Sequence, residues 1–179
     1  VLSSYLRNKV GGCEGNSLTT QQKAVLEAFD NNNRVIVKGF RRFGLTTLSL
    51  LKICHDIAFS SVDVAYVSNT SSLSSARTML KGFMNASDST FMIDSYTKSC
   101  MRVVCNGNVS SVRFVSPSSF NAHGFDSSRR EVFVFDNADF YEAHLEGLVY
   151  NDNSVIIVMS TPSESSNGGF FRKLWTESM

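Results

Sequence analysis

The sequence has few cysteines and prolines, almost no excess charge and no long hydrophobic run. Its cysteines have no C-x-x-C spacing, and the three histidines do not complete a ligand set with Cys13, Cys54, Cys100 and Cys105. This pattern favours reduced thiols over a zinc site or a disulfide framework. No apolar run reaches the roughly 18 residues that a membrane-spanning helix needs. A net charge of +1 argues against a generally basic, nucleic-acid-coating protein and leaves room for a local basic patch.

The length and composition are those of one globular domain. With 179 residues, of which 42% are hydrophobic, the chain is long enough to bury a core. No internal repeat or charged tail marks a boundary, so we expect residues 1–179 to form a single domain. The N-terminus lacks the apolar core of a signal peptide and begins with Val instead of Met. We therefore expect a processed protein or a piece of a longer one.

Helical and strand patterns alternate along the sequence. Apolar residues at helical spacing, with Thr19 or Thr20 as the first cap, predict helices at 18–29, 46–59, 71–84, 139–149 and 168–175. Continuous apolar runs predict buried strands at 34–38, 62–68, 131–136 and 154–160. The stretch 101–116 predicts a hairpin around an Asn106-Gly107 turn. Together these elements predict an α/β fold with a mostly parallel central sheet, flanked by helices, and with the hairpin as an antiparallel addition at one edge.

The stretch GFRRFGLTT, residues 39–47, has most of a phosphate-binding loop. Gly39, Gly44 and Thr46 match the spacing of the P-loop pattern, but Leu45 stands at the lysine position. The stretch lies between a predicted strand and a predicted helix, where backbone N–H groups can point at one anion. Thr46 is then the hydroxyl that can reach a magnesium ion. Three nearby cations either replace the lysine or belong to an ordinary solvated turn: Lys38, Arg41 and Arg42.

Two later strands end in residues that suit a nucleotide site. The run EVFVFD ends in Asp136, which is placed like the Walker B carboxylate that reaches Mg²⁺. A glutamate commonly follows as general base, but here Asn137 follows and cannot act as one. The nearest carboxylate is Asp139, which is either the base or a first-turn helix residue. The run SVIIVMST ends in Ser160 and Thr161, which either sense the γ-phosphate or form a turn with the next proline.

These three features follow one another in an order that is more specific than any one of them. Each of the three features lies at the C-terminal end of a predicted strand, where ligands bind in open α/β sheets. The sequence resembles the ATPase domain of large terminase subunits, the motors that package viral DNA in tailed phages and herpesviruses. The resemblance covers roughly residues 18–176 and rests on LTTQQKAVL, VIVKGFRRFGLTT, VFVFDNADF and VIIVMSTPSESSNGGFFRKLW. It implies a RecA-like P-loop NTPase fold and a chain without the family's nuclease domain.

The resemblance also implies an ATP hydrolase that uses ATP and Mg²⁺. Gln22, four residues after Leu18, matches the family's adenine-recognition glutamine. By the same resemblance, the residues expected to hold the nucleotide are Gln22, Lys38, Gly39, Gly44, Thr46 and Thr47. The expected roles of the others are catalytic for Arg41, Arg42, Asp136 and Asp139, metal binding for Thr46 and Asp136, and coupling for Ser160 and Thr161.

Three positions depart from the family pattern. Leu45 replaces the Walker A lysine, Asn137 replaces the catalytic glutamate, and His123 stands where members often show Arg-Gly. We favour a working motor, with a hydrolysis-impaired binding or assembly subunit as the alternative and a helicase-like ATPase as a weaker one. A motor of this family would act on double-stranded DNA, with the portal, the procapsid and the small terminase subunit as partners. We expect a homo-oligomeric ring in the infected host cell (cytoplasm for a phage, nucleus for a herpesvirus-like virus) and no membrane partner.

Overall fold

The computed structural model describes residues 18–87, 91–120, 129–138, 154–161 and 171. Its helices are α2 (Thr20–Asn31), α3 (Leu45–Phe59), α4 (Thr70–Ala86) and the 3-10 helix η1 (Pro117–Ser119). Its strands are β1 (Arg34–Lys38), β2 (Val62–Val67), β3 (Met92–Tyr96), β4 (Cys100–Cys105), β5 (Asn108–Val115), β6 (Arg130–Asp136) and β7 (Val155–Ser160). The predicted helices at 139–149 and 168–175 lie outside the described residues, apart from Phe171. The other predicted elements are confirmed to within two residues at each end.

Local sequence signals account for the starts of the helices. Thr19 caps α2: its hydroxyl accepts the N–H of Gln22, and the Gln22 side chain accepts the N–H of Thr19 in return, forming a capping box. Asn69 caps α4 by accepting the N–H of Ser72. Gly44 precedes α3 with a φ of 88°, a left-handed conformation that glycine adopts without steric strain. Of the two threonines predicted as the first cap, Thr19 is therefore the one that caps.

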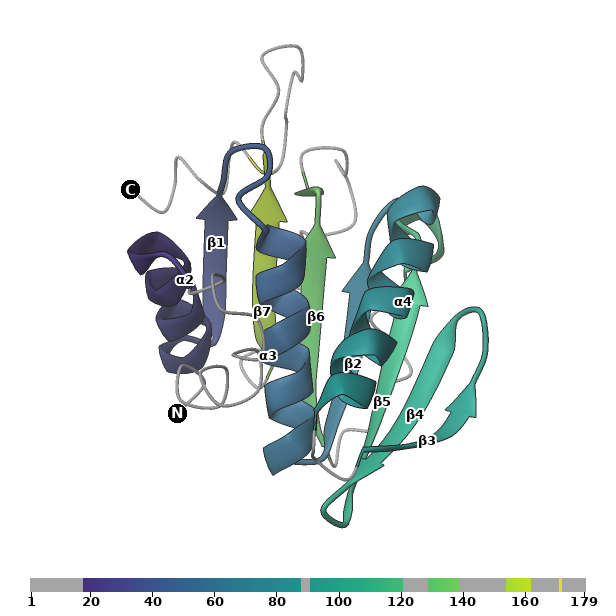
Figure 1. Ribbon diagram of the computed structural model, residues 1–179. Coiled ribbons are helices and arrows are strands. Elements are labelled where there is room, and N and C mark those ends of the chain that lie inside the picture. Colours follow the sequence, from purple (N-terminus) through teal and green to yellow (C-terminus); the bar gives the residue numbers. More distant parts are fainter. Residues whose placement is uncertain (1–17, 88–90, 121–128, 139–153, 162–170, 172–179) are drawn as a thin grey trace.

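The strands form one sheet in the order β1-β7-β6-β2-β5-β4-β3 (Figure 1). Its first five strands are parallel, while β4 and β3 run antiparallel to their neighbours. This confirms the α/β fold with a mostly parallel sheet and an antiparallel edge. The hairpin itself differs in one respect, because its second strand, β5, joins the parallel part of the sheet beside β2. Strand β3, which was not predicted, forms the outer edge beyond β4.

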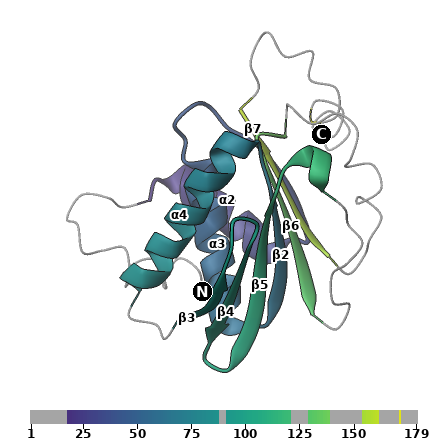
Figure 2. The same cartoon turned by 90° about the vertical axis from the view of Figure 1, so that its right-hand side faces the viewer.

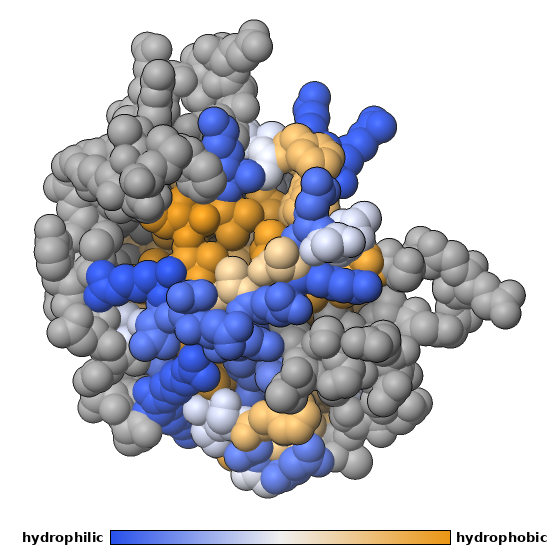
Figure 3. All heavy atoms as spheres, turned by 90° about the vertical axis from the view of Figure 1, so that its left-hand side faces the viewer, coloured by the Kyte–Doolittle hydropathy of each residue, from blue (hydrophilic) through white to orange (hydrophobic). Residues whose placement is uncertain are grey.

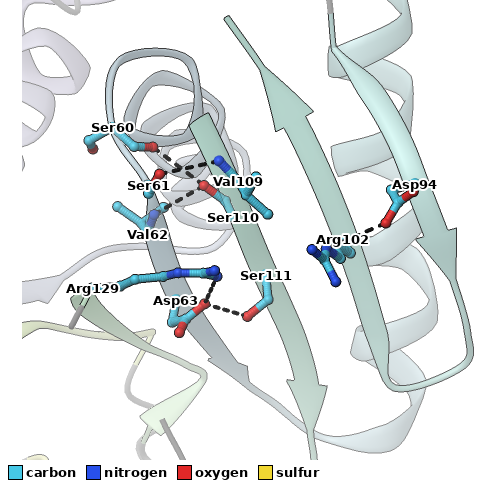
Figure 4. Close-up of polar contacts among 10 residues, drawn as sticks. All are labelled: Ser60, Ser61, Val62, Asp63, Asp94, Arg102, Val109, Ser110, Ser111 and Arg129. Atoms are coloured by element: carbon cyan, nitrogen blue, oxygen red, sulfur yellow. Dashed lines mark hydrogen bonds and ion pairs between the residues drawn. The ribbon is translucent and has the colours of Figure 1, made fainter. Parts of the chain in front are cut away.

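Polar contacts at the start of β2 fix the parallel register of β5 (Figure 4). The Ser110 hydroxyl accepts the N–H of Val62 at 3.0 Å, and the Ser61 hydroxyl accepts the N–H of Val109 at 3.2 Å. On the next residue of each strand, Ser111 donates to Asp63 at 2.6 Å. Because a shift of one residue would break all of these bonds, they select one alignment of two strands that are far apart in sequence.

Apolar side chains are buried on both faces of the sheet. In β2, Val64 and Tyr66 pack in the larger cluster with the helices, whereas Ala65 and Val67 join a second cluster with Phe171. The described helices α2, α3 and α4 all lie on the first face (Figure 2). Burial on both faces explains the continuous apolar runs that predicted these strands. None of the helices in the described ranges combines the length and the apolar character needed to cross a membrane.

Strand β1 forms the other outer edge of the described sheet. Only Val35 in this strand is fully buried. On the side of the molecule where α2 and β1 lie, an area of hydrophobic atoms reaches the surface between hydrophilic side chains (Figure 3). Among the described residues, the centre of the sheet is therefore covered more completely than its β1 edge.

Candidate nucleotide site

The predicted phosphate loop connects β1 to α3 at the C-terminal end of the parallel sheet (Figure 1). It begins where the Gly39 N–H donates to the Ser160 carbonyl at 2.9 Å, which ties the loop to the end of β7. A turn follows, closed by the Phe43 N–H and the Phe40 carbonyl at 3.1 Å. Arg42 lies in this turn with a φ of 69°, which is uncommon for a residue other than glycine. The backbone of the loop is thus held at both ends, as an anion-binding loop requires.

The loop encloses a cavity of about 850 Å³ together with the ends of β6 and β7. This volume is within the usual range for small-molecule sites. The lining residues are Lys38, Gly39, Phe40, Arg41, Arg42, Phe43, Gly44, Leu45, Thr46, Asp136, Asn137, Ser160 and Thr161. The structure therefore brings together the loop, the three cations, the carboxylate strand and the Ser-Thr strand, which the sequence predicted separately.

Asp136 is the polar centre of the site. It is only 4% exposed, yet its Oδ2 accepts a hydrogen bond from the Thr46 hydroxyl at 2.8 Å and another from the Tyr66 hydroxyl at 2.6 Å. The Ser68 hydroxyl donates to the Asp136 backbone carbonyl at 3.3 Å. Burial, and then the negative charge of Asp136, raise the pKa of Tyr66 well above its usual value, so Tyr66 remains protonated and donates.

The position of the missing lysine faces the core. Leu45 is 7% exposed and belongs to the larger hydrophobic cluster. It packs so closely against Gly39 that a Cβ on that glycine would lie 2.7 Å from Leu45 Cδ1. Positive charge at the cavity comes instead from Lys38, Arg41 and Arg42, all of which are exposed. The three cations that the sequence singled out therefore line the cavity, and their role in binding phosphate remains a prediction.

Two of the predicted nucleotide-binding residues do not line the cavity. The Gln22 amide nitrogen donates to the Phe43 carbonyl at 2.9 Å, while its oxygen takes part in the capping box of α2. Gln22 therefore braces the loop against α2. Thr47 turns toward α4, where its hydroxyl lies 3.8 Å from the Met79 sulfur. The adenine contact predicted for Gln22 and the phosphate contact predicted for Thr47 both remain predictions.

Asn137 occupies the position where a general base was sought. It lines the cavity directly after Asp136 and has a φ of 59°. Asn tolerates this left-handed conformation better than most residues do, and its amide cannot accept a proton as a base does. The predicted base Asp139 and the departure at His123 lie outside the described residues. Within the described part of the cavity, Asp136 is therefore the one carboxylate among the lining residues.

The polar groups at the site suit both Mg²⁺ and phosphate. Thr46 and Asp136 present oxygen atoms, the ligands that Mg²⁺ prefers, and Mg²⁺ commonly binds one or two carboxylates together with substrate phosphates. The cations and the loop N–H groups suit an anion. No group of three or more His, Cys, Asp or Glu side chains gathers in the described ranges in a way that could hold a metal by itself. Thr46 and Asp136 therefore suit a metal that arrives bound to the phosphates of a nucleotide.

This combination of fold and loop defines a RecA-like α/β domain. No protein-family model matches the chain, and no curated protein matches its sequence. Among solved structures, its neighbours include large terminases of bacteriophages. The large terminase of bacteriophage HK97 aligns with a TM-score of 0.72 and 12% identity, over 99% of this chain and 40% of that protein.

Two further solved structures show the same likeness. An ATPase-domain mutant of the large terminase of a Thermus phage has a TM-score of 0.60 and 11% identity, over 90% of this chain and 70% of that one. The large terminase of a thermophilic bacteriophage in complex with ATP-γ-S has a TM-score of 0.60 and 12% identity, over 82% of this chain and 38% of that one. At these identities the likeness concerns the fold. The chain spans only two fifths or so of the two longer proteins.

Proposed function

We propose that this chain is the ATPase domain of a viral large terminase, which couples ATP hydrolysis to the translocation of double-stranded DNA into a procapsid. One observation carries the proposal: the Thr46 hydroxyl of the loop helix lies 2.8 Å from the Asp136 carboxylate of a neighbouring strand, at the wall of the loop cavity. A hydroxyl and a carboxylate at that place are the two protein groups that P-loop ATPases use around Mg²⁺. The terminase fold of the neighbouring structures supports the choice of motor.

In this proposal each part of the cavity has one task. Thr46 and Asp136 would hold a Mg²⁺ ion, which would neutralise phosphate charge. The loop N–H groups between Gly39 and Gly44, apart from that of Phe43, which binds the Phe40 carbonyl, bind phosphate oxygens. Arg41, Arg42 and Lys38 supply the positive charge that the lysine would otherwise give. Phosphoryl transfer depends mainly on positioning and charge stabilisation, so a displaced cation can serve this purpose.

Other predicted roles complete the proposal. Gln22 holds the adenine while it braces the loop, and Thr47 supports the phosphate contacts from the first turn of α3. Asp139 is the base, and Ser160 and Thr161 transmit the loss of the γ-phosphate. Ser160 is suited to this role because its carbonyl already binds the first N–H of the loop at 2.9 Å.

A second candidate function is a nucleotide-binding subunit that hydrolyses ATP poorly. The observation that favours it is Asn137, which lines the cavity directly after Asp136 and cannot accept a proton. Such a subunit would keep the fold, the loop and Asp136, and would serve in binding or assembly. Both candidates bind nucleotide, so the rate of ATP hydrolysis is the property that distinguishes them.

For the motor we propose double-stranded DNA, the portal and procapsid, and the small terminase subunit as partners. We propose that the motor translocates DNA as a homo-oligomeric ring inside the infected host cell.

ATP turnover in the presence of double-stranded DNA tests the proposal. We expect Asp136→Asn and Thr46→Ala to lower the rate about 100-fold, the scale of losing one preorganised charge-stabilising group. Asp94→Asn is the matched control, because Asp94 is an exposed carboxylate on β3 that pairs with Arg102. Equal rates for Asp136→Asn and Asp94→Asn would contradict the site. If the wild type binds ATP without turnover and Asn137→Asp or Asn137→Glu restores it, the second candidate is correct.

A further inference from the structure

Tyr66 contributes to the site although it does not line the cavity. It lies near the end of β2 and its side chain is fully buried. Its hydroxyl is 2.6 Å from Asp136 Oδ2, the same oxygen that accepts the Thr46 hydroxyl at 2.8 Å. One carboxylate oxygen thus receives two donors, one from the loop helix and one from the core.

These contacts leave the Asp136 carboxylate little freedom. The Ser68 hydroxyl donates to the backbone carbonyl of Asp136, so β2 and the residue that follows it hold both the side chain and the main chain of Asp136. Asp136 is 4% exposed, and a buried carboxylate that loses a donor must turn toward another one. Thr46 is another donor to this carboxylate, and its single proton is already committed to Oδ2. Tyr66 therefore decides how firmly Thr46 and Asp136 keep their relative positions.

The strength of the Tyr66 contact follows from its surroundings. In a buried site a hydrogen bond to an ionised group is shorter and stronger than one between neutral groups. An ionised carboxylate can only accept, so the Tyr66 hydroxyl is the donor in this bond. A phenylalanine would fill nearly the same volume and remove only this donor.

We propose that Tyr66 is a positioning residue for magnesium: it fixes the Asp136 carboxylate from the core side, so that the metal-dependent share of nucleotide affinity depends on a side chain that touches neither metal nor nucleotide. This inference rests on the proposed nucleotide site and adds a residue that the loop and strand motifs do not contain.

The test compares Tyr66→Phe with the wild type for ADP binding by calorimetry, once with Mg²⁺ and once with EDTA. We expect the dissociation constant with Mg²⁺ to rise about tenfold, the effect of losing one hydrogen bond to a charged acceptor. The constant in EDTA should stay within about twofold of the wild type, because the loop contacts are unchanged. Tyr96→Phe is the matched control, since it removes a hydroxyl from a tyrosine that is 43% exposed on β3.

Equal or tighter binding of Mg²⁺ and ADP by a folded Tyr66→Phe protein overturns the inference and leaves the proposed function intact. Failure of the wild type to bind ADP in either buffer overturns the proposed function, and the inference with it. A second measurement serves if Tyr66→Phe does not fold. In wild-type protein with ¹³C-labelled tyrosine rings, assigned by changing the other tyrosines to Phe one at a time, adding Mg²⁺ to the ADP complex should shift the Tyr66 resonance and not that of Tyr96. An unresponsive Tyr66 resonance contradicts the inference.

Discussion

Restoring the lysine of the phosphate loop should destabilise the protein before it helps a nucleotide to bind. Leu45 is 7% exposed and packs against Gly39, with no room for a Cβ on that glycine. In Leu45→Lys the aliphatic stem can stay partly buried, but its ammonium group must leave the core for the cavity that Leu45 lines. There it meets the positive charges of Arg41 and Arg42.

The size of the effect follows from the burial of Leu45. Full burial of a leucine side chain is worth about 1.5–3 kcal/mol, so losing most of it should lower the free energy of unfolding by about 2 kcal/mol. For a protein of this size the melting temperature should fall by roughly 4–8 °C. Leu45→Met, which keeps an apolar side chain of similar volume, should lower the free energy of unfolding by less than about 1.5 kcal/mol.

Thermal unfolding with and without Mg²⁺ and ADP measures both parts of the prediction. Without nucleotide, Leu45→Lys should melt below the wild type and below Leu45→Met. Nucleotide should then raise its melting temperature by more than it raises that of the wild type, because the new ammonium lies beside the phosphates and tighter binding stabilises the folded state. A Leu45→Lys protein as stable as the wild type without nucleotide would refute the assignment of Leu45 to the core.

Three further predictions concern residues away from the loop. Lys52→Met should lower the free energy of unfolding, measured by urea titration, by about 3 kcal/mol, because the buried Asp56 carboxylate loses the ammonium group that pairs with it. Arg102→Met is the control and should have little effect, because the ion pair of Arg102 with Asp94 is exposed. Burial alone would raise the pKa of Asp56, but the hydrogen bond with His55 and the charge of Lys52 outweigh it and hold that pKa below its usual value. Asp56 therefore stabilises the fold at neutral pH, and this stability is lost as the pH falls through the lowered pKa. Asp56→Asn should flatten that acidic part of the pH profile of unfolding. Asn137→Glu should destabilise the protein by about 1 kcal/mol more than Asn137→Asp, measured by the same titration, because φ is 59° at this position.

The elements with strong local patterns could be predicted from the sequence, whereas strand β3, which is held by tertiary contacts, could not. Strands such as β6 and β7 are continuous apolar runs because both of their faces are buried. Strand β3, with the sequence MIDSY, has no buried residue, and its Asp94 is of a type that is depleted in strands. It forms because β4 offers it an edge. The parallel pairing of β5 with β2 depends on contacts such as Ser110 with Val62, which no local pattern contains.

The candidate site shows the same division. The Gly39–Gly44 spacing and the acidic end of β6 are visible in sequence, and the structure places them around one cavity. Tyr66 was missed because its role depends on β2 lying beside β6, a pairing between residues that are 70 positions apart. The only local signal is a hydroxyl near the end of a strand whose other residues, apart from Asp63, are apolar. For Gln22 the spacing suggested a ligand contact, while the structure adds a second role in bracing the loop through the Phe43 carbonyl.

Strand β7 lies between β1 and β6, so the sheet fixes the distance between the phosphate loop and Asp136. Two inter-strand spacings, about 10 Å in all, separate the strand that enters the loop from the strand that carries Asp136. Main-chain hydrogen bonds set this span, including the one from Gly39 to Ser160. Side-chain substitutions therefore change the charge and the reactivity of the cavity without changing the spacing of these strands. A protein that loses hydrolysis through such substitutions keeps the same distance between β1 and β6. It can therefore continue to bind a nucleotide of the same size after turnover is lost.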